Sequence, residues 1–446
     1  MDFVVIGGDA AGMSAASRAK RNQPDLKVTV LEKTMDVSYS ACGMPYNIAD
    51  PGREMDELVV RHAAVFREKQ DINLLTGHCA ERIDPDHQIV TGTTLEGENF
   101  HVPYDKLLIA TGASAIRPDL PGIDLPEVMV LKSLADGRKI KQFIKSDQAG
   151  KVVVVGMGYI ALEMCEALRA LNIDVVMVKP RPIFLPWLEE QMAQVVKEEV
   201  ESNGVGMYPG YAVEGVEKSG AHLRVVCTDL SLECDMVLVS VGVKPNSETA
   251  SEAGLALSVG NSISVDRTVR TSDENIFAAG DCADAVHIVT GQKTWIPLAL
   301  RANRAGWAVA DNVCGKEVKL QGIVGTAVFK VFGLEVANTG LNPAEATKYG
   351  FDVAQVTVQT RSRAHAHPGS SQIWVHMLGD KQSGRLLGVQ MVGREGVAHR
   401  INAPAVALHS HMTVEQFSQS DLAYAPPFGP VWDPMLTAAN QLLKKM

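Results

Sequence analysis

The feature that most constrains the fold is a strand, a glycine-rich turn and a helix at the start of the chain. The apolar residues 3–6 lead into a turn that begins at Gly7 and ends at Gly12, and the strand after the helix ends at Glu32. Gly7 permits the tight turn, Gly12 lets helix and strand pack closely, and the helix N-terminus suits a pyrophosphate. An acid at the position of Glu32 binds ribose hydroxyls. Asp9 departs from the pattern, because it stands where the middle glycine is expected.

A second copy of this pattern starts at residue 152. The valines 152–155 precede Gly156 and Gly158, and a helix-like stretch and another strand follow. The acid expected at the end of that strand is replaced by Lys179, with Arg181 close behind. Two cations there favour a 2′-phosphate on the ribose, unless both are ordinary surface charges. Two such units predict an α/β protein with two dinucleotide-binding domains.

Two further strands end in residues that suit the same kind of site. One leads into Thr111 and Gly112, and the other ends in Gly280 and Asp281. An aspartate at the carboxyl end of a strand, beside a flavin-type site, can accept a hydrogen bond from a ribitol hydroxyl. The alternative for Asp281 is a residue that simply ends a strand.

Cys42 stands alone in Ser-Tyr-Ser-Ala-Cys-Gly-Met-Pro-Tyr, just downstream of the first unit. The next cysteine is Cys79, so a redox-active Cys42 needs a small-molecule sulfur or oxygen as its partner. The alternative is a buried, inert thiol. Pro45 and the residues after it predict the start of a helix, whose dipole would lower the pKa of the thiol.

Length and composition narrow the class of protein. The 446 residues suffice for two or three domains, and the net charge of −10 argues against a nucleic-acid partner. The seven cysteines are irregularly spaced and form no metal-type pair, which predicts a reducing cytoplasm and no bound metal. We expect no secretory leader and no membrane span, because no apolar run is long enough.

The order of these motifs resembles the flavin-dependent pyridine nucleotide-disulfide oxidoreductases over the whole chain. The element around Cys42 is similar to their single-cysteine branch, which holds coenzyme A-disulfide reductases, NAD(P)H persulfide reductases and water-forming NADH oxidases. Ala-Tyr-Ala-Pro-Pro-Phe at 423–428 looks like the coenzyme A-disulfide reductase group. The resemblance implies two Rossmann-like domains and a C-terminal α+β domain that forms a homodimer. Its domains would be 1–112 with 245–320 for FAD, 113–244 for NAD(P)H, and 321–446 for dimerisation.

The resemblance also implies which residues do the chemistry. NAD(P)H would reduce the flavin on one face, and electrons would pass to a Cys42 mixed disulfide or persulfide on the other. Tyr424 would reach this site from the other subunit. A second tyrosine of the coenzyme A branch is missing, and His367 lies in the matching stretch. His367 either supplies a proton or is an ordinary loop residue. The residues expected to bind FAD or NADPH or NADH are Gly7, Gly12, Glu32, Lys33, Thr111, Gly112, Gly156, Gly158, Tyr159, Ile160, Glu163, Lys179, Arg181, Gly242, Gly280 and Asp281.

Coenzyme A, as the expected thiol moiety, carries phosphates and therefore needs cations near its site. The resemblance places its contacts on the first helix and in the segments around Cys42. The expected residues are Arg18, Lys20, Arg21, Ser38, Arg61 and, for stacking with adenine, Phe66. Solvated surface charge, or core packing for Phe66, is the alternative for each. Two other functions remain open: an NAD(P)H oxidase in which Cys42 cycles through a sulfenic acid, and a slow-turnover flavoprotein that acts as a redox sensor.

Overall fold

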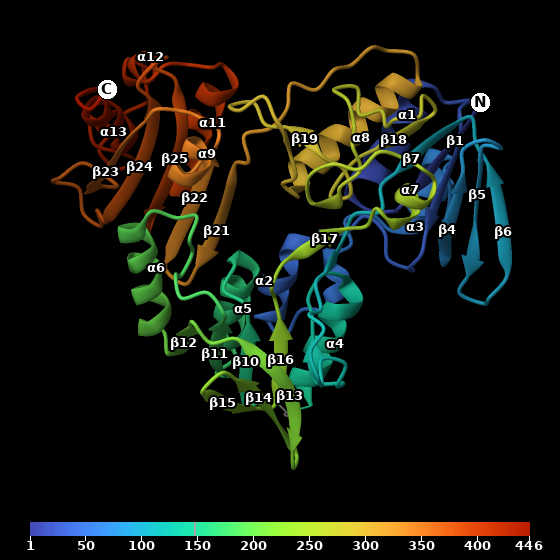
Figure 1. The fold of residues 1–446 in the computed structure, drawn as a ribbon, viewed down its shortest axis with the longest axis horizontal. Helices are drawn as coiled ribbons and strands as arrows, with labels where there is room; N and C mark the ends of the chain where they lie inside the picture. Colours follow the sequence, from blue (N-terminus) through green and yellow to red (C-terminus); the bar gives the residue numbers. More distant parts are fainter. Residues whose placement is uncertain (147–148) are drawn as a thin grey trace.

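The computed structural model describes residues 1–146 and 149–446. Figure 1 shows three lobes, each built around its own five-stranded sheet. The first sheet is parallel, with the order β18-β7-β1-β2-β3. Its strands are β1 (Asp2–Ile6), β2 (Lys27–Glu32), β3 (Asn73–Thr76), β7 (Lys106–Ile109) and β18 (Ile276–Ala278). This lobe also holds α1 (Ala10–Asn22), α3 (Ala63–Gln70), α7 (Glu248–Glu252), α8 (Ala299–Val313), the ribbon β4 (His78–Asp84), β5 (Ile89–Thr94) and β6 (Asn99–Pro103), and the hairpin β19 (Ala285–Val286) and β20 (Lys293–Thr294). The chain of this lobe also reaches the second lobe, where α2 (Met44–Ile48) lies beside α5 (Tyr159–Ala170).

The second lobe repeats the parallel arrangement, with the order β12-β11-β10-β16-β9. Its strands are β9 (Val128–Met129), β10 (Lys151–Val155), β11 (Asp174–Lys179), β12 (Val205–Pro209) and β16 (Met236–Val239). Its helices are α4 (Leu134–Lys145), α5 (Tyr159–Ala170) and α6 (Glu190–Ser202), and β13 (Val213–Ser219), β14 (His222–Cys227) and β15 (Leu230–Cys234) form a ribbon beside the sheet. The antiparallel pair β8 (Ala113–Ala115) and β17 (Val243–Pro245) joins this lobe to the first.

The third lobe is built on an antiparallel sheet, with the order β21-β22-β25-β24-β23. Its strands are β21 (Ala327–Val331), β22 (Leu334–Gly340), β23 (Val353–Arg361), β24 (Gln372–Asp380) and β25 (Leu386–Gly393). Its helices are α9 (Pro343–Lys348), α10 (Val397–Arg400), α11 (Asn402–His409), α12 (Val414–Ser418) and α13 (Pro434–Leu443). The predicted fold class, two Rossmann-like units followed by an α+β unit, is confirmed.

The valine-rich strands lie where the sequence pattern predicts them. Four valines of β10 are buried, and the strand has a parallel neighbour on each side. A central parallel strand covered by helices needs apolar residues on both faces, which explains the continuous run. The carboxyl ends of β1 and β10 carry the two glycine-rich turns.

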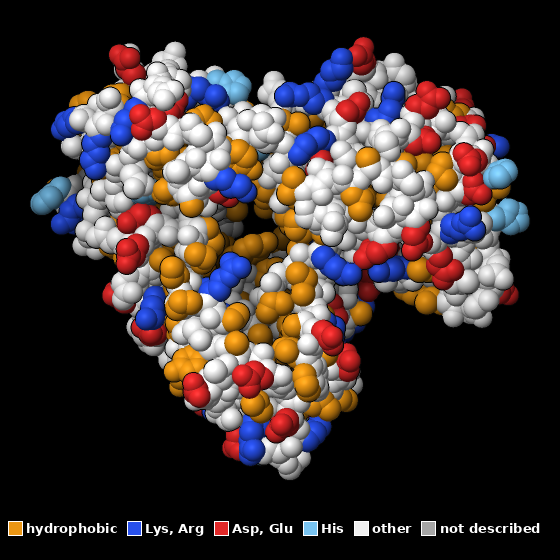
Figure 2. Space-filling view, viewed as in Figure 1, with side chains coloured by type: hydrophobic (Ala, Val, Ile, Leu, Met, Phe, Trp, Pro, Cys, Tyr) orange, Lys and Arg blue, Asp and Glu red, His pale blue; other side chains and the backbone are white. Residues whose placement is uncertain are grey.

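Contacts between the lobes lie close to these turns. Helix α2, from the chain of the first lobe, packs against α4 and α5 of the second, and Phe329 of the third lobe lies 6.2 Å, ring centre to ring centre, from Tyr159. Figure 2 shows a hollow where the three lobes meet, with hydrophobic side chains on its walls. Within the described ranges, no helix combines the length and the apolar character needed to cross a membrane.

Candidate active site

The first glycine-rich turn is closed on both sides by backbone. Gly7 has a φ of +113°, and a Cβ atom there would lie 2.2 Å from the Ala110 carbonyl oxygen. A Cβ atom at Gly12 would lie 1.9 Å from the Gly7 carbonyl oxygen. Neither position therefore tolerates a side chain. The amide of Gly8 donates to Glu32 Oε2 at 2.7 Å, which holds the Glu32 carboxylate beside the turn.

The start of α1 is available to an anion. Asp9 stands at the N-cap, but its side chain makes no capping hydrogen bond to the helix. The first amides of a helix then need another acceptor, and a phosphate is well suited to them. An uncapped helix start beside the Glu32 carboxylate fits the pyrophosphate and ribose of FAD.

At the carboxyl end of the same sheet, Asp281 faces a lysine that the sequence analysis missed. Lys132 Nζ lies 3.4 Å from Asp281 Oδ2, and both side chains are half-buried. Trp295 Nε1 donates to the Asp281 carbonyl oxygen at 2.8 Å. On the neighbouring strand end, Thr111 Oγ1 donates to the Asn246 carbonyl oxygen at 2.6 Å. No motif pointed to Lys132, which precedes α4 in the second lobe.

The second glycine-rich turn repeats the geometry of the first. Gly156 has a φ of +118°, and a Cβ atom there would lie 2.2 Å from the Ser240 carbonyl oxygen. Open space surrounds the Cβ position of Gly158, the N-cap residue of α5. Gly242 also has a positive φ, of +122°. The turn fits a second dinucleotide at the start of α5.

Lys179 and Arg181 lie together at the end of β11. Lys179 Nζ donates to the Ile183 carbonyl oxygen at 2.7 Å. Burial lowers the pKa of Lys179, and the nearby charge of Arg181 lowers it further. Arg181 itself is exposed. Both cations therefore lie at the end of β11, the strand next to the one that carries the second turn.

The Cys42 segment is bonded to the first turn. The Ser38 amide donates to the Gly8 carbonyl oxygen at 3.0 Å, and the Tyr39 amide donates to Asp9 Oδ1 at 3.2 Å. Cys42 is an exposed, free thiol in a short 3₁₀ turn, Ala41–Gly43. The predicted helix is confirmed as α2, with Pro45 in its first turn.

The same segment is also bonded to the second lobe. The Tyr46 hydroxyl donates to Glu163 Oε1 at 2.9 Å, which connects α2 to α5. Burial raises the pKa of Glu163, and the bond from Tyr46 opposes that effect. Glu163 and Tyr159 lie one turn apart on α5, so Cys42 lies on the segment between the two glycine-rich turns.

The protein groups around the thiol act against the fall in its pKa that the helix start and a flavin were expected to cause. The pKa of Cys42 is raised, first by desolvation and then by the negative charge of Glu163, while Lys132 opposes the rise. The helix that was expected to stabilise the thiolate has only five residues, so few aligned peptide units contribute to its dipole.

A buried lysine anchors the far end of α2. Lys141 Nζ donates to the carbonyl oxygens of Asn47, Asp50 and Arg53 at 2.8, 2.9 and 2.6 Å, and to Asn47 Oδ1 at 2.9 Å. Lys141 is 6% exposed and Asn47 is fully buried. Because Lys141 lies on α4, the second lobe fixes the position of the Cys42 helix from two sides.

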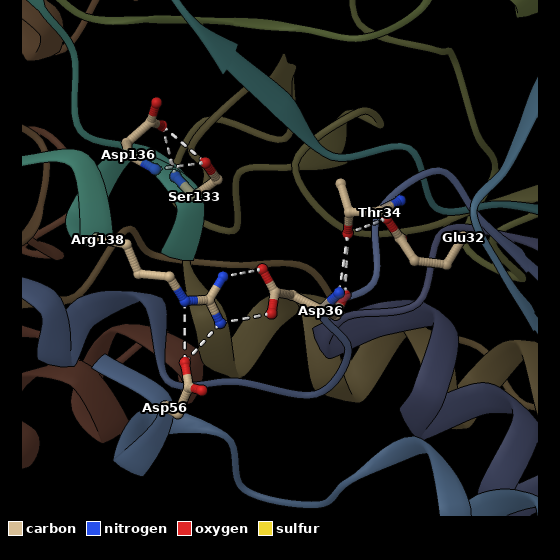
Figure 3. Close-up of polar contacts among 7 residues, drawn as sticks. All are labelled: Glu32, Thr34, Asp36, Asp56, Ser133, Asp136 and Arg138. Atoms are coloured by element: carbon tan, nitrogen blue, oxygen red, sulfur yellow. Dashed lines mark hydrogen bonds and ion pairs between the residues drawn. The ribbon is translucent and has the colours of Figure 1, made fainter. Parts of the chain in front are cut away.

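Figure 3 shows a network of polar contacts that starts at Glu32. Thr34 Oγ1 donates to Glu32 Oε1 at 2.8 Å and accepts from the Asp36 amide at 3.3 Å. Arg138 of α4 donates to both Asp36 oxygens at 2.8 Å and to Asp56 Oδ1 at 2.6 Å. The network ties the loop after β2 to the second lobe and to the segment that follows Cys42.

The expected coenzyme A residues fall into two groups. Lys20 is buried, and its amine donates to Asp71 Oδ2 and to two carbonyl oxygens. Phe66 is 1% exposed within the core of the first lobe. Neither has a free face for a ligand, so both expectations are wrong. Arg18 makes a two-pronged ion pair with Asp311 at 2.9 and 2.7 Å.

The other expected contacts remain accessible. Arg21 and Arg61 are exposed, and no ion pair involves them among the described residues. Ser38 is half-buried, has a φ of +48°, and supports the Cys42 segment through its backbone. The Arg18 guanidinium also lies 5.0 Å from the ring centre of Trp307, a half-exposed tryptophan on α8.

Tyr424 and His367 lie in neighbouring segments of the third lobe. The Ala364 amide donates to the Pro426 carbonyl oxygen at 3.1 Å. Tyr424 is 49% exposed, and His367 Nδ1 lies 3.0 Å from the Pro368 carbonyl oxygen. In the described part of the chain, no hydrogen bond or ion pair joins either segment to the Cys42 segment.

Arg400 holds these two segments in place. Its guanidinium donates to the Ser362 and Phe428 carbonyl oxygens at 3.1 and 2.6 Å, and to Asp433 Oδ2 at 2.8 Å. Phe428, Val431 and Trp432, in the same stretch as Tyr424, are 78, 67 and 65% exposed. Such a row of exposed apolar residues is typical of a surface that another chain covers.

Comparison with known proteins finds relatives that match this chain over nearly its whole length. The chain is 36% identical over 440 residues to the NAD(P)H sulfur oxidoreductase (CoA-dependent) of Pyrococcus abyssi, covering 98% of this chain and 97% of that protein. It is 32% identical over 451 residues to an NADH oxidase of Methanocaldococcus jannaschii, covering 100% of this chain and 99% of that protein.

A solved structure matches over the whole chain. The NAD-dependent persulfide reductase from A. fulgidus superposes with a TM-score of 0.96 at 36% identity, covering 100% of this chain and 83% of that one. Residues 1–306 match the family model for pyridine nucleotide-disulphide oxidoreductases, and residues 326–435 match the dimerisation domain of that family. The chain belongs to the pyridine nucleotide-disulphide oxidoreductase family.

Proposed function

We propose that this protein uses FAD and NAD(P)H to reduce the disulfide or persulfide of a small thiol, with coenzyme A as the first candidate, through Cys42. We assign FAD to residues 1–112 and 245–320, NAD(P)H to 113–244, and the dimer contact to 321–446. The "CoA-dependent" relative and the persulfide reductase support the choice of substrate class. A homodimer is supported by the match to a dimerisation domain.

The main support for the proposal is that the Cys42 segment is hydrogen-bonded both to the first glycine-rich turn and to the helix that starts at the second. The Tyr39 amide bonds to Asp9 in the first glycine-rich turn, and Tyr46 bonds to Glu163 beside the second. No described cysteine forms a disulfide, and Cys42 is the exposed one. A thiol in this position has a small molecule, rather than a second cysteine, as its redox partner.

The overall reaction balances with one two-electron donor. NAD(P)H, one proton and a disulfide RSSR give NAD(P)⁺ and two thiols, RSH. The Cys42 thiolate attacks one sulfur of RSSR, a bond forms between Cys42 Sγ and that sulfur, and RS⁻ leaves. FAD held at the first glycine-rich turn would supply the electron pair for cleavage of the Cys42–sulfur bond, and NAD(P)H at the second turn would be the source of that pair.

The residues of the chain set the state of the thiol. Lys132 is the nearby cation that favours the Cys42 thiolate, and Glu163 is the carboxylate that disfavours it. We assign proton delivery to the leaving thiolate to Tyr424 of the other subunit. The substrate phosphates are assigned to Arg21 and Arg61, whose charges stand free on the surface.

The test is turnover of the holoenzyme under anaerobic conditions, with coenzyme A disulfide and coenzyme A persulfide as substrates. Cys42→Ser should bind a full complement of FAD, and its rate of thiol production should be at least about a hundredfold lower than that of the wild type. Cys79→Ser is the matched control, because Cys79 is also a free, partly accessible cysteine of the first lobe. A Cys42→Ser enzyme that matches the wild type would contradict the proposal.

Two other outcomes would replace it. In a parallel assay in air, an enzyme that consumes oxygen rapidly but leaves both sulfur substrates untouched in the anaerobic assay would be an NAD(P)H oxidase, as the Methanocaldococcus relative is named. An enzyme that turns over none of the three would be a redox sensor. The three functions are separated by one set of rates measured with a single preparation.

A further inference from the structure

Asp9 is an unusual residue for its place in the fold. It stands at the middle glycine position of the first turn, where the backbone approaches a pyrophosphate. It is the N-cap of α1 but does not cap the helix. Its carboxylate instead accepts the Tyr39 amide at 3.2 Å, from the segment that carries Cys42. A negative charge here belongs to the same turn that would hold the phosphates of the cofactor assigned to this site.

The charges around Asp9 come from three other elements. Glu32 at the end of β2 and Asp281 after β18 are both acidic, and Lys132, before α4, is the one cation among the groups that act on Asp9. Burial raises the pKa of Asp9 to about 6, with Glu32 and Asp281 adding to the rise, while the Tyr39 amide and Lys132 oppose it. Asp9 therefore titrates within the range in which enzymes work.

We propose that Asp9 must be neutral for tight FAD binding, so that uptake of FAD by this protein is coupled to uptake of one proton. The inference rests on the assignment of FAD to the first turn. A pyrophosphate brings two negative charges to a site that already holds Glu32 and Asp281. Protonation of Asp9 removes the third carboxylate charge and keeps the side chain that receives the Tyr39 amide.

The sign of the pH effect follows from linkage. Below about pH 6 Asp9 is protonated with or without FAD, so the affinity is constant. Above about pH 6 the free protein has lost the proton, and binding must restore it. The Kd for FAD then rises by up to about tenfold per pH unit, until the pKa of Asp9 in the bound state is reached.

The experiment dilutes the holoenzyme from micromolar to nanomolar concentrations at pH 5.5 to 8.5 and measures the fluorescence of released FAD. For the wild type we expect the Kd to rise at least about tenfold between pH 6 and pH 8. Asp9→Asn should bind with a Kd that changes less than about twofold over the same range. Asp25→Asn changes an exposed acid of the same lobe, which makes no side-chain hydrogen bond or ion pair among the described residues, and should keep the wild-type slope.

A second measurement does not depend on the variant. FAD rebinding to the wild type at pH 7.5, followed calorimetrically in two buffers of different ionisation enthalpy, should show uptake of close to one proton. A flat wild-type profile, an unchanged slope in Asp9→Asn, or no proton uptake would overturn the inference and leave the function standing. Absence of FAD binding at every pH would overturn both.

Discussion

Tyr46, the third residue of α2, donates its hydroxyl to Glu163 on the helix that starts at the second glycine-rich turn. The two residues are 117 positions apart in sequence, and their contact is 2.9 Å long. It joins the thiol segment to the nicotinamide side of the proposed site. A substitution at Tyr46 is therefore expected to change the surroundings of Glu163, and a substitution at Glu163 is expected to change those of the Cys42 segment.

Tyr46→Phe should slow flavin reduction by NAD(P)H about two- to tenfold. The hydroxyl makes a hydrogen bond to a carboxylate, and such a bond contributes on the order of 1 kcal/mol. Its loss also removes the one contact that lowers the pKa of Glu163. Stopped-flow absorbance measures the rate. As a control, Tyr349→Phe changes an exposed tyrosine of the third lobe and should leave the rate unchanged. Equal rates for Tyr46→Phe and wild type would show that the Tyr46–Glu163 hydrogen bond does not affect flavin reduction.

Glu163→Gln should make the Cys42 thiol more acidic. The carboxylate raises the pKa of Cys42, so the neutral amide should move the midpoint of thiolate formation to lower pH. Iodoacetamide alkylation of the holoenzyme, followed by mass spectrometry across pH 6 to 10, reports this midpoint. Glu166→Gln, on the same helix but paired with Lys330, is the control. A midpoint that stays fixed or moves upward in Glu163→Gln would refute the proposed coupling.

Much of the fold was predictable from the sequence, because the two glycine-rich turns depend on local constraints. At Gly7 and Gly156 the backbone lies too close for any side chain, and the valine strands before them are buried on both faces. The helix at Pro45 was also predictable from local sequence, because proline favours the first turn of a helix. These features appear within a few residues of sequence.

The contacts that tune the site were not predictable, since they join distant segments. Lys132 reaches Asp281 across 149 positions, and Arg18 reaches Asp311 across 293. The two causes that raise the pKa of Cys42, burial of the thiol and the approach of Glu163, cannot be seen in the local sequence. Lys20 and Phe66 were misplaced because charge or aromatic character alone does not show whether a helix face is buried.

Lys179→Glu combined with Arg181→Glu should lower the preference for NADPH over NADH about ten- to a hundredfold. We expect the two cations to share one charge-assisted contact to a 2′-phosphate, and one such contact is worth roughly 1.5–3 kcal/mol. The ratio of kcat/KM for the two cofactors measures this preference. Lys197→Glu, a lysine on α6 of the same lobe, should leave the ratio unchanged. An unaltered ratio in the double variant would place both cations outside the cofactor site.

Arg400→Met should slow reduction of the sulfur substrate and leave flavin reduction by NAD(P)H within about twofold of wild type. Arg400 and Asp433 are 12 and 13% exposed, and breaking a buried pair costs about 3–5 kcal/mol. The Tyr424 and His367 segments would lose their shared anchor. Rapid-reaction kinetics separates the two half-reactions, and Arg400→Lys should recover part of the lost rate. Equal slowing of both half-reactions would indicate general damage to the fold.

Tyr424→Phe should slow the sulfur half-reaction alone, and mixed dimers can locate its partner. When Cys42→Ser chains exchange with Tyr424→Phe chains, one site of each mixed dimer holds an intact Cys42 and a Tyr424 from the other chain. Activity should therefore rise above that of either parent. No rise after exchange, verified by native mass spectrometry, would place Tyr424 in its own subunit's site or outside the chemistry.

The proposed mechanism depends on a mixed disulfide between Cys42 and coenzyme A that is reduced through the flavin. An anaerobic titration tests this step directly. Holoenzyme is first treated with excess coenzyme A disulfide, desalted, and then titrated with NADPH while flavin absorbance and released thiol are recorded. We expect wild-type subunits to take up two equivalents of NADPH and release one coenzyme A thiol each, and Cys42→Ser subunits to take up one equivalent and release no thiol. Two equivalents and one released thiol in Cys42→Ser would contradict the mechanism.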